Sequence, residues 1–141
     1  MENIIAYEPA VVLDACAIIA FLANETGAEF TENILINNSC YMHALNVCEV
    51  YYNIARSAGT SQADAFVRWL TDEAGVVIRT DIDQDLWIDA GIIKATLRRI
   101  SLADCFCVAL ARRLHAPVIT ADHTEFKSVQ SNSYCSVTFI R

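Results

Sequence analysis

Short apolar segments alternate with amphipathic ones along this chain, and that alternation restricts the fold more than any other feature. Five segments have the brevity and apolar composition of buried strands, over residues 10–13, 40–45, 75–80, 117–120 and 135–140. The segments between them have helical spacing, over residues 14–35 with a break near 24–27, then 46–59, 60–74, 82–98 and 101–115. We therefore predict an α/β fold with a mainly parallel central sheet of four or five strands and helices on both faces.

The length of the chain indicates one domain. With 141 residues, it can bury about two-thirds of its unfolded surface around a single core. It contains no repeat and no low-complexity tract that would serve as a linker. We expect residues 1–141 to form a single domain. In its helix over residues 82–98, we expect Leu86, Ile88, Ile92 and Ile93 to face the interior.

Several features argue against a membrane or secreted protein. The most apolar run, residues 10–23, is too short to span a bilayer and carries Asp14 in its middle. The N-terminal MENIIAYEPA lacks the basic segment that opens a secretory signal. The six cysteines read as buried free thiols rather than a disulfide framework, because Cys16, Cys48 and others lie within apolar runs. The sequence thus predicts a cytoplasmic protein.

The composition predicts association with another chain. Apolar residues make up 55% of the sequence and the mean hydropathy is +0.33, and both values are high for a soluble protein. The expected helices over residues 46–74 carry aromatic side chains of the kinds enriched at interfaces. These are Tyr51, Tyr52, Phe66 and Trp69, and the alternative is that they belong to the core.

The charge excludes nucleic-acid binding through overall basicity, because the formal net charge is −7 at pH 7. Basic residues nevertheless gather just before Ser101, at Lys94, Arg98 and Arg99. This cluster is either a solvated face or a set of local contacts to RNA.

Three acidic residues have a structural explanation that competes with a functional one. Ser101 and Asp104 have the spacing of a capping box, in which both side chains satisfy backbone N–H groups at a helix start. Asn46 and Glu49 have the same spacing. Asp122 follows an expected strand and is explained as a turn residue.

Asp14 is harder to explain in this way, because apolar residues flank it on both sides and no basic residue lies near it in the sequence. A carboxylate buried without a partner becomes neutral. Asp14 and Asp122 follow strands, and Glu49 and Asp104 lie in helical turns that begin at the same edge of the sheet, where α/β folds bind ligands.

Four carboxylates at one edge require a counter-charge. Two unit charges ~4 Å apart repel by about 4 kcal/mol at an effective dielectric constant of 20. A divalent cation with oxygen ligands removes this repulsion, so we predict a Mg²⁺ or Mn²⁺ site. Such a site is suited to hydrolysis of phosphodiester bonds. We expect Asp14 and Asp104 as principal ligands, Asp122 as a direct or water-mediated ligand, and Glu49 as a ligand or as the group that orients the attacking water.

Other hydrolase classes fit less well. A phosphatase of the haloacid dehalogenase type would need a second aspartate two residues after Asp14, where the chain has Cys16. The histidines, His43, His115 and His123, are scattered and match no Ser–His–Asp order.

Taken in order, these motifs resemble those of PIN-domain nucleases, in particular toxins of the VapC type from toxin–antitoxin pairs. The resemblance rests on the segments VVLDACAIIAFLA, NVCEVYYNIAR and LADCFCVALARRLHAPVITADHTEF, and it extends over about residues 10–126. It implies an endoribonuclease that depends on Mg²⁺ or Mn²⁺. The catalytic acids of that family match Asp14, Glu49, Asp104 and Asp122.

The resemblance also implies auxiliary residues and partners. Thr120 matches a hydroxyl residue near the last acid, whereas Ala15 and Cys16 stand where Ser or Thr is usual. Glu125 reads as a surface residue in preference to an auxiliary acid. The implied partners are an RNA substrate, a second copy in a homodimer, and a small antitoxin whose basic C-terminal segment covers an apolar groove beside the acids. The alternative is a catalytically inactive PIN-like binding module.

Overall fold

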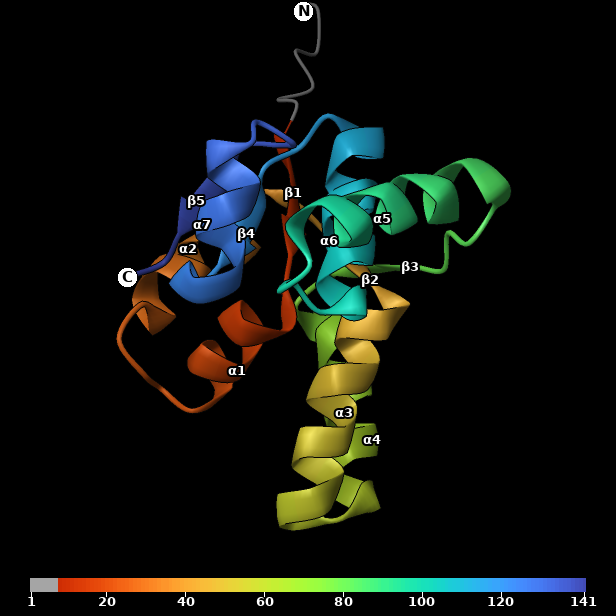
Figure 1. Ribbon diagram of the computed structural model, residues 1–141. Helices are drawn as coiled ribbons and strands as arrows, with labels where there is room; N and C mark the ends of the chain where they lie inside the picture. The colour runs from red at the N-terminus through yellow and green to blue at the C-terminus, as the bar shows by residue number, and fades with distance from the viewer. Residues whose placement is uncertain (1–7) are drawn as a thin grey trace, which may run out of the picture.

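The computed structural model describes residues 8–141 and contains a central sheet of five strands, all parallel (Figure 1). The strands are β1 (Ala10–Leu13), β2 (Ser39–His43), β3 (Val77–Arg79), β4 (Val118–Thr120) and β5 (Val137–Phe139). Their order across the sheet is β3-β2-β1-β4-β5. The predicted α/β fold with a parallel sheet is confirmed. The prediction about a secretory signal falls largely on residues 1–7, which lie outside the described residues.

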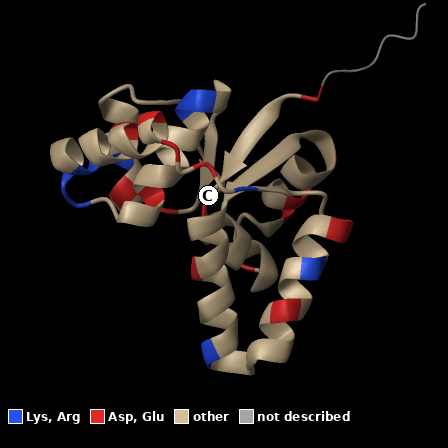
Figure 2. Ribbon diagram, turned by 90° about the vertical axis from the view of Figure 1, so that its right-hand side faces the viewer, with Lys and Arg blue, Asp and Glu red and all other residues tan. Residues whose placement is uncertain are grey.

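Helices connect the strands. They are α1 (Ala15–Leu22), α2 (Ala28–Asn37), α3 (Ala44–Ala58), α4 (Thr60–Arg68), α5 (Gln84–Leu97), α6 (Leu102–Leu114) and α7 (His123–Ser131), and α4 continues as a π-helical segment over Trp69–Glu73. Helices α3 and α4 pack against each other and form an arm that extends away from the sheet (Figure 2). None of the helices within residues 8–141 is both long enough and apolar enough to span a membrane.

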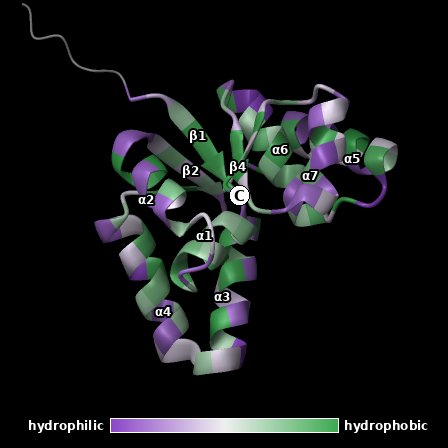
Figure 3. Ribbon diagram, turned by 90° about the vertical axis from the view of Figure 1, so that its left-hand side faces the viewer, coloured by the Kyte–Doolittle hydropathy of each residue, from purple (hydrophilic) through white to green (hydrophobic). Residues whose placement is uncertain are grey.

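The sheet has a core on each face because successive side chains of a strand point in opposite directions. Val12 and Val118 pack with α5, α6 and α7 on one face. Val11, Leu13 and Ile119 pack with α1 to α4 on the other. Figure 3 shows the hydrophobic character of β1 and β4, which are neighbours in the middle of the sheet. The expectation of helices on both faces is therefore confirmed.

The interior face of α5 differs from the predicted one. Leu86, Ala90 and Ile93 are buried, whereas Ile88 and Ile92 are 40% and 55% exposed. At 3.6 residues per turn, Leu86, Ala90 and Ile93 form one stripe along the helix. Ile88 and Ile92 lie on nearly the opposite side, so the prediction was wrong for these two residues.

Helix α7 was not predicted from the sequence. Asp122 caps it, because its Oδ1 accepts a hydrogen bond from the Glu125 N–H at 3.1 Å. An aspartate followed three residues later by a glutamate is a known helix-start pattern. The sequence therefore carried a signal for α7, and Asp122 is a helix cap rather than an ordinary turn residue.

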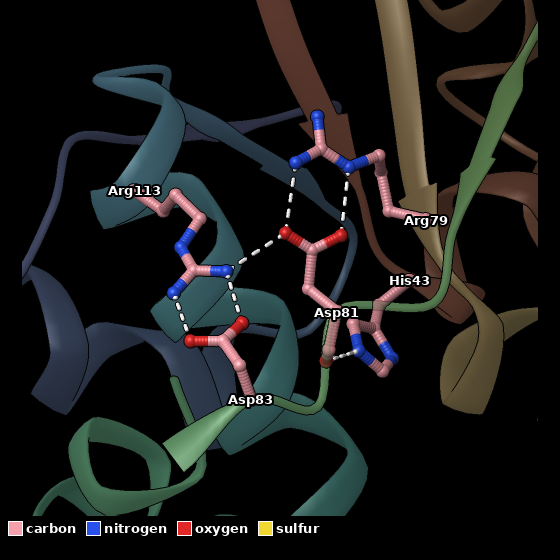
Figure 4. A network of polar contacts seen from close by, with 5 residues as sticks. All are labelled: His43, Arg79, Asp81, Asp83 and Arg113. Carbon is pink, nitrogen blue, oxygen red and sulfur yellow. Dashed lines mark hydrogen bonds and ion pairs between the residues drawn. The ribbon is translucent and has the colours of Figure 1, made fainter. Parts of the chain in front are cut away.

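A cluster of charged residues holds the loop between β3 and α5 (Figure 4). Asp81 accepts hydrogen bonds from Arg79 at 2.7 and 2.8 Å and from Arg113 at 3.0 Å. Arg113, near the end of α6, also donates to both carboxylate oxygens of Asp83. His43 Nε2 donates to the Asp81 carbonyl at 2.8 Å, while His43 Nδ1 accepts a backbone N–H and caps α3. The cluster thus joins the start of α3 to the end of α6.

Replacing Arg113 with alanine is expected to lower the Tm at neutral pH by a few degrees and to lower it much less at about pH 2. The guanidinium groups of Arg79 and Arg113 hold the pKa of Asp81 well below its usual range, and the Arg113 hydrogen bonds lower the pKa of Asp83 to about 2. Such carboxylates stabilise the fold above their unfolded pKa of about 3.9, and this contribution is lost as the pH falls through the folded pKa.

Thermal unfolding followed by circular dichroism at several pH values measures this effect. Arg68→Ala is the control, because Arg68 is exposed and has no ion pair within residues 8–141. An equal loss of Tm at both ends of the pH range would contradict the prediction.

Candidate active site

The predicted acidic residues gather at the carboxyl edge of the sheet, next to the two central strands. The chain runs from β1 to β2 and β3 on one side, and then returns to β4 on the other side of β1. In open α/β sheets, the crevice at such a reversal is the usual ligand position. Asp14 directly follows β1, and Asp122 follows β4 by one residue. The topology therefore brings these two acids to one place.

Asp14 is fully buried and is held by two hydrogen bonds. Its Oδ2 accepts the Thr120 hydroxyl at 2.5 Å, and its Oδ1 accepts the Ala17 N–H at 2.9 Å and caps α1. The Thr120 oxygen in turn accepts the Asp122 N–H at 2.9 Å. Thr120 therefore links the acids that follow the two strands. Burial raises the pKa of Asp14 to about 7, and the charges of Asp122 and Glu49 act in the same direction.

Asp104 does not complete the capping box that its spacing suggested. Ser101 does cap α6, because its Oγ accepts the Asp104 N–H at 3.2 Å. The Ser101 N–H, however, donates to Glu125 Oε2 at 3.3 Å rather than to Asp104. The Asp104 carboxylate instead accepts the Asn46 side-chain amide at 3.3 Å. Burial raises the pKa of Asp104 well above its usual range, and its contact with Glu125 and the charge of Asp14 raise it further.

Glu125, which the sequence favoured as a surface residue, is partly exposed but lies within the acidic cluster. Carboxylate oxygens of Asp104, Asp122 and Glu125 all lie within 4.8 Å of one another. Glu125 is half-buried in the first turn of α7 and reaches across to the start of α6. The sequence did not reveal this, because α7 itself was missed. Asp14 and Glu49 are not members of this close trio, but both interact with its charges.

Glu49 faces the cluster from α3. It is half-buried, and its pKa is raised by burial and then by the charges of Glu125 and Asp122. The expected capping box of Asn46 and Glu49 is absent, because His43 caps α3. Asn46 is fully buried, and its Oδ1 has no hydrogen-bond partner within residues 8–141.

No basic side chain pairs with the acids of this cluster in the described part of the chain. The cluster has five acids, Asp14, Glu49, Asp104, Asp122 and Glu125. None of their carboxylates has a Lys, Arg or His partner within 4.0 Å in the described part of the chain. Their donor atoms are all carboxylate oxygens, which are the ligands preferred by hard divalent cations. Asp14 and Asp104 are buried, and burial raises the pKa of each carboxyl so far that it binds a proton at or near neutral pH when no counter-charge is present. This donor set fits a divalent cation.

Cysteine positions differ in part from the expectation of buried thiols. Cys105 and Cys107 are buried, but Cys48 is exposed and Cys16 is half-buried. Burial raises the pKa of the Cys16 thiol, and the nearby charges of Asp14 and Asp122 raise it further. Cys16 is therefore a neutral thiol beside the acids.

The predicted basic cluster lies at the end of α5, which carries Lys94, and in the loop to α6, which carries Arg98 and Arg99. Lys94 Nζ donates to the carbonyls of Arg98 and Ile100, at 2.8 and 2.6 Å, and so holds the loop. Arg98 and Arg99 are exposed and have no ion pair within the described residues. The loop leads directly into Ser101, which contacts Glu125. Two free guanidinium groups thus lie close in sequence to the acidic cluster.

The fold and the acidic edge define an α/β domain with a candidate cation site at its strand reversal. The model of the PIN domain matches residues 11–131. The chain therefore belongs to the PIN domain family, as the sequence motifs predicted. A search among curated proteins found no match.

Solved structures of toxin–antitoxin complexes have the same fold. VapBC-1 from nontypeable Haemophilus influenzae superposes with a TM-score of 0.70 at 20% identity, covering 93% of this chain and 98% of that one. DNA-bound VapBC from Salmonella typhimurium superposes with a TM-score of 0.71 at 17% identity, covering 94% of this chain and 99% of that one. VapC20 from Mycobacterium tuberculosis is a Sarcin-Ricin loop cleaving toxin. It superposes with a TM-score of 0.64 at 14% identity, covering 84% of this chain and 94% of that one. At these identities the similarity establishes the fold.

Proposed function

We propose that this chain is an endoribonuclease that depends on Mg²⁺ or Mn²⁺ and acts as the toxin of a toxin–antitoxin pair. The observation that carries the proposal is the convergence of five carboxylates, without a basic partner, at the strand reversal of a PIN domain. The similarity of its fold to VapBC proteins and to VapC20, the Sarcin-Ricin loop cleaving toxin, supports the same conclusion. The proposed nuclease domain spans residues 1–141.

Each acid has a role in this proposal. Asp104 and Asp122 would hold the cation together with Asp14, whose charge acts on both of them. Glu125 lies within 4.8 Å of Asp104 and Asp122 and would assist them. A divalent cation at such a site stabilises the negative charge that develops on the phosphate. Glu49 orients the attacking water and accepts its proton, since it is the acid that approaches from α3 and is only half-buried. Thr120 fixes the orientation of Asp14.

Cleavage of a mixed RNA pool, with mapping of the cut sites, tests the proposal. We expect cleavage with Mn²⁺ or Mg²⁺ and none with a chelator. RNA binding without cleavage in the presence of either cation would instead identify a PIN-like binding module. In that case the lack of cleavage would be explained by Ala15 and Cys16, which stand where a hydroxyl residue is usual in the family.

The loop between α5 and α6 is proposed to contact RNA through Arg98 and Arg99, with Lys94 shaping it. Replacing both arginines with alanine is expected to weaken RNA binding and to reduce the slope of log K against log salt by about 1.4, or 0.7 for each phosphate contact. Fluorescence anisotropy with a labelled single-stranded RNA at several salt concentrations measures this slope. Arg68→Ala, on α4, serves as the control. An unchanged slope in the double variant would show that the loop does not contact RNA.

The proposed partners are a second copy of the chain and an antitoxin. Exposed Tyr52 on α3 and the exposed apolar residues of α5 favour association, whereas Phe66 belongs to the core. We expect a dimer by light scattering at tens of micromolar, and a monomer would contradict it. An apolar groove of about 550 Å³ between α1, α3 and α4, lined by Phe21, Ile54 and Trp69 among others, is the proposed seat of the antitoxin.

The antitoxin segment in that groove is proposed to carry an Arg or Lys into the acidic cluster, and the net charge of −7 favours such a basic partner. Removal of the basic C-terminal segment of the antitoxin is expected to abolish inhibition, and full inhibition without it would refute this mode. We propose that the protein works in the cytoplasm, where cellular RNA is present and unpaired cysteines stay reduced.

A further inference from the structure

Asn46 lies in a position that its role at a helix start does not explain. It is the third residue of α3 and is fully buried. Asparagine competes with the backbone for hydrogen bonds inside a helix and is favoured at the cap instead. His43 already caps α3. The presence of an amide at position 46 therefore requires another reason.

The amide N–H of Asn46 points to the acidic cluster. Its Nδ2 donates to Asp104 Oδ1 at 3.3 Å, across the contact between α3 and α6. Within residues 8–141 it is the one neutral side chain that donates a hydrogen bond to this carboxylate, whose charged neighbours are acids. The pair repeats the relation of Thr120 to Asp14. Each of the two buried acids thus has one buried neutral donor.

The amide oxygen of Asn46 is unpaired. It is buried, and it is the one such side-chain atom without a hydrogen-bond partner within residues 8–141. Buried polar atoms in native proteins nearly always have a partner, and an exception often marks the position of a bound water or ion. The Asn46 oxygen therefore indicates a group that is present when the acidic site is filled.

We propose that Asn46 is a positioning residue for the cation site, which orients Asp104 as an ionised ligand through Nδ2 and accepts a hydrogen bond from water of the filled site through Oδ1. This inference rests on the proposed function, because it assumes a divalent cation at Asp104. An amide suits both tasks, since it has a donor and an acceptor on one planar group. Partners of this kind change metal affinity by tenfold or more when they are removed.

Calorimetric titration of the full chain with Mn²⁺, without RNA, tests the inference apart from catalysis. Asn46→Ala is expected to weaken Mn²⁺ binding by about tenfold or more, while the Tm of the cation-free protein changes little. Asn46→Ser keeps a donor in a smaller side chain and is expected to recover part of the loss. Asn53→Ala is the matched control, because Asn53 lies about two turns further along α3 and is exposed. It is expected to bind Mn²⁺ as the wild type does.

Two results would overturn the inference. One is an Asn46→Ala protein that binds Mn²⁺ within about threefold of the wild type, well short of the tenfold expected. The other is a lower cation-free Tm with unchanged affinity, which is the result of lost packing alone. If Asn46→Ala does not fold, Asn46→Ser decides, since a several-fold loss supports the inference and wild-type affinity overturns it. A wild-type chain that binds no Mn²⁺ would refute the proposed cation site itself, and this inference with it.

Discussion

Asp104→Asn is expected to abolish cation-dependent RNA cleavage and to leave the fold intact. The variant keeps an oxygen that accepts the Asn46 amide, and α6 keeps its cap, because Ser101 Oγ accepts the backbone N–H of residue 104. What it loses is a negative charge at the proposed cation site. If that charge contributes about 4 kcal/mol to the transition state, its loss lowers the rate by about a thousandfold.

The measurement is single-turnover cleavage of a mapped RNA with saturating Mn²⁺, together with the Tm of the variant. The Tm is expected to change by no more than a cap change of about 1 kcal/mol would cause. Asp72→Asn, at an exposed position far along the chain from the acids, is the charge-matched control. Near-normal cleavage by Asp104→Asn would leave residue 104 with a structural role alone.

Asp14→Asn is expected to make the cation-free protein more stable at about pH 8, by about 2 kcal/mol. Asp14 is fully buried and burial raises its pKa to about 7. A carboxyl with a raised folded pKa binds its proton more tightly in the native state, so the free energy of unfolding falls as the pH rises from about 4 to about 7. A shift of about three pKa units corresponds to about 4 kcal/mol, and the weaker hydrogen bonds of asparagine offset part of it.

The same reasoning gives the pH dependence and the response to cations. At about pH 5 wild-type Asp14 is mostly neutral, so the advantage of the asparagine variant is expected to disappear. Mg²⁺ or Mn²⁺ at a hundredfold excess over Kd should stabilise the wild type by about 2.7 kcal/mol, and the variant far less. Urea unfolding of the wild type and the variant at both pH values, with and without cation, measures the free energy of unfolding under these four conditions. A wild type whose stability responds to neither pH nor cation would contradict the buried charge cluster.

The sequence predicted the fold well where local signals agree with the tertiary structure. Strands β1 and β4 are short, mostly apolar and each preceded by a proline, and α6 is capped by Ser101 as the capping pattern indicates. Helix α5 was located, but its interior face was assigned by apolar identity rather than by angular position, which misplaced Ile88 and Ile92. Apolar side chains on an exposed stripe cannot be distinguished from core residues by composition alone.

For the site, the sequence predicted four of the five clustered acids and the neighbouring Thr120, but not the support that Asn46 gives to Asp104. Asp14 and Asp122 follow strands, so the topology of a parallel sheet brings them together. Glu125 was undervalued because its position depends on α7, and Asn46 was read as a cap because its spacing to Glu49 matches one. Contacts across helices, such as those of Asn46 with Asp104 and of Glu125 with Ser101, leave no pattern in a single sequence.

The hydrogen bond between Thr120 and Asp14 joins residues 106 positions apart in the chain, and this separation has a consequence for protein synthesis. Ribosomes release a chain from its N-terminus, and a domain folds as a unit once its parts are available. An unfinished chain that stops before β4 contains Asp14, Glu49 and Asp104 but lacks one of the two strands that pair with β1. Truncated products of this length therefore carry three of the five acids without the cluster, and only nearly complete molecules contain the assembled site.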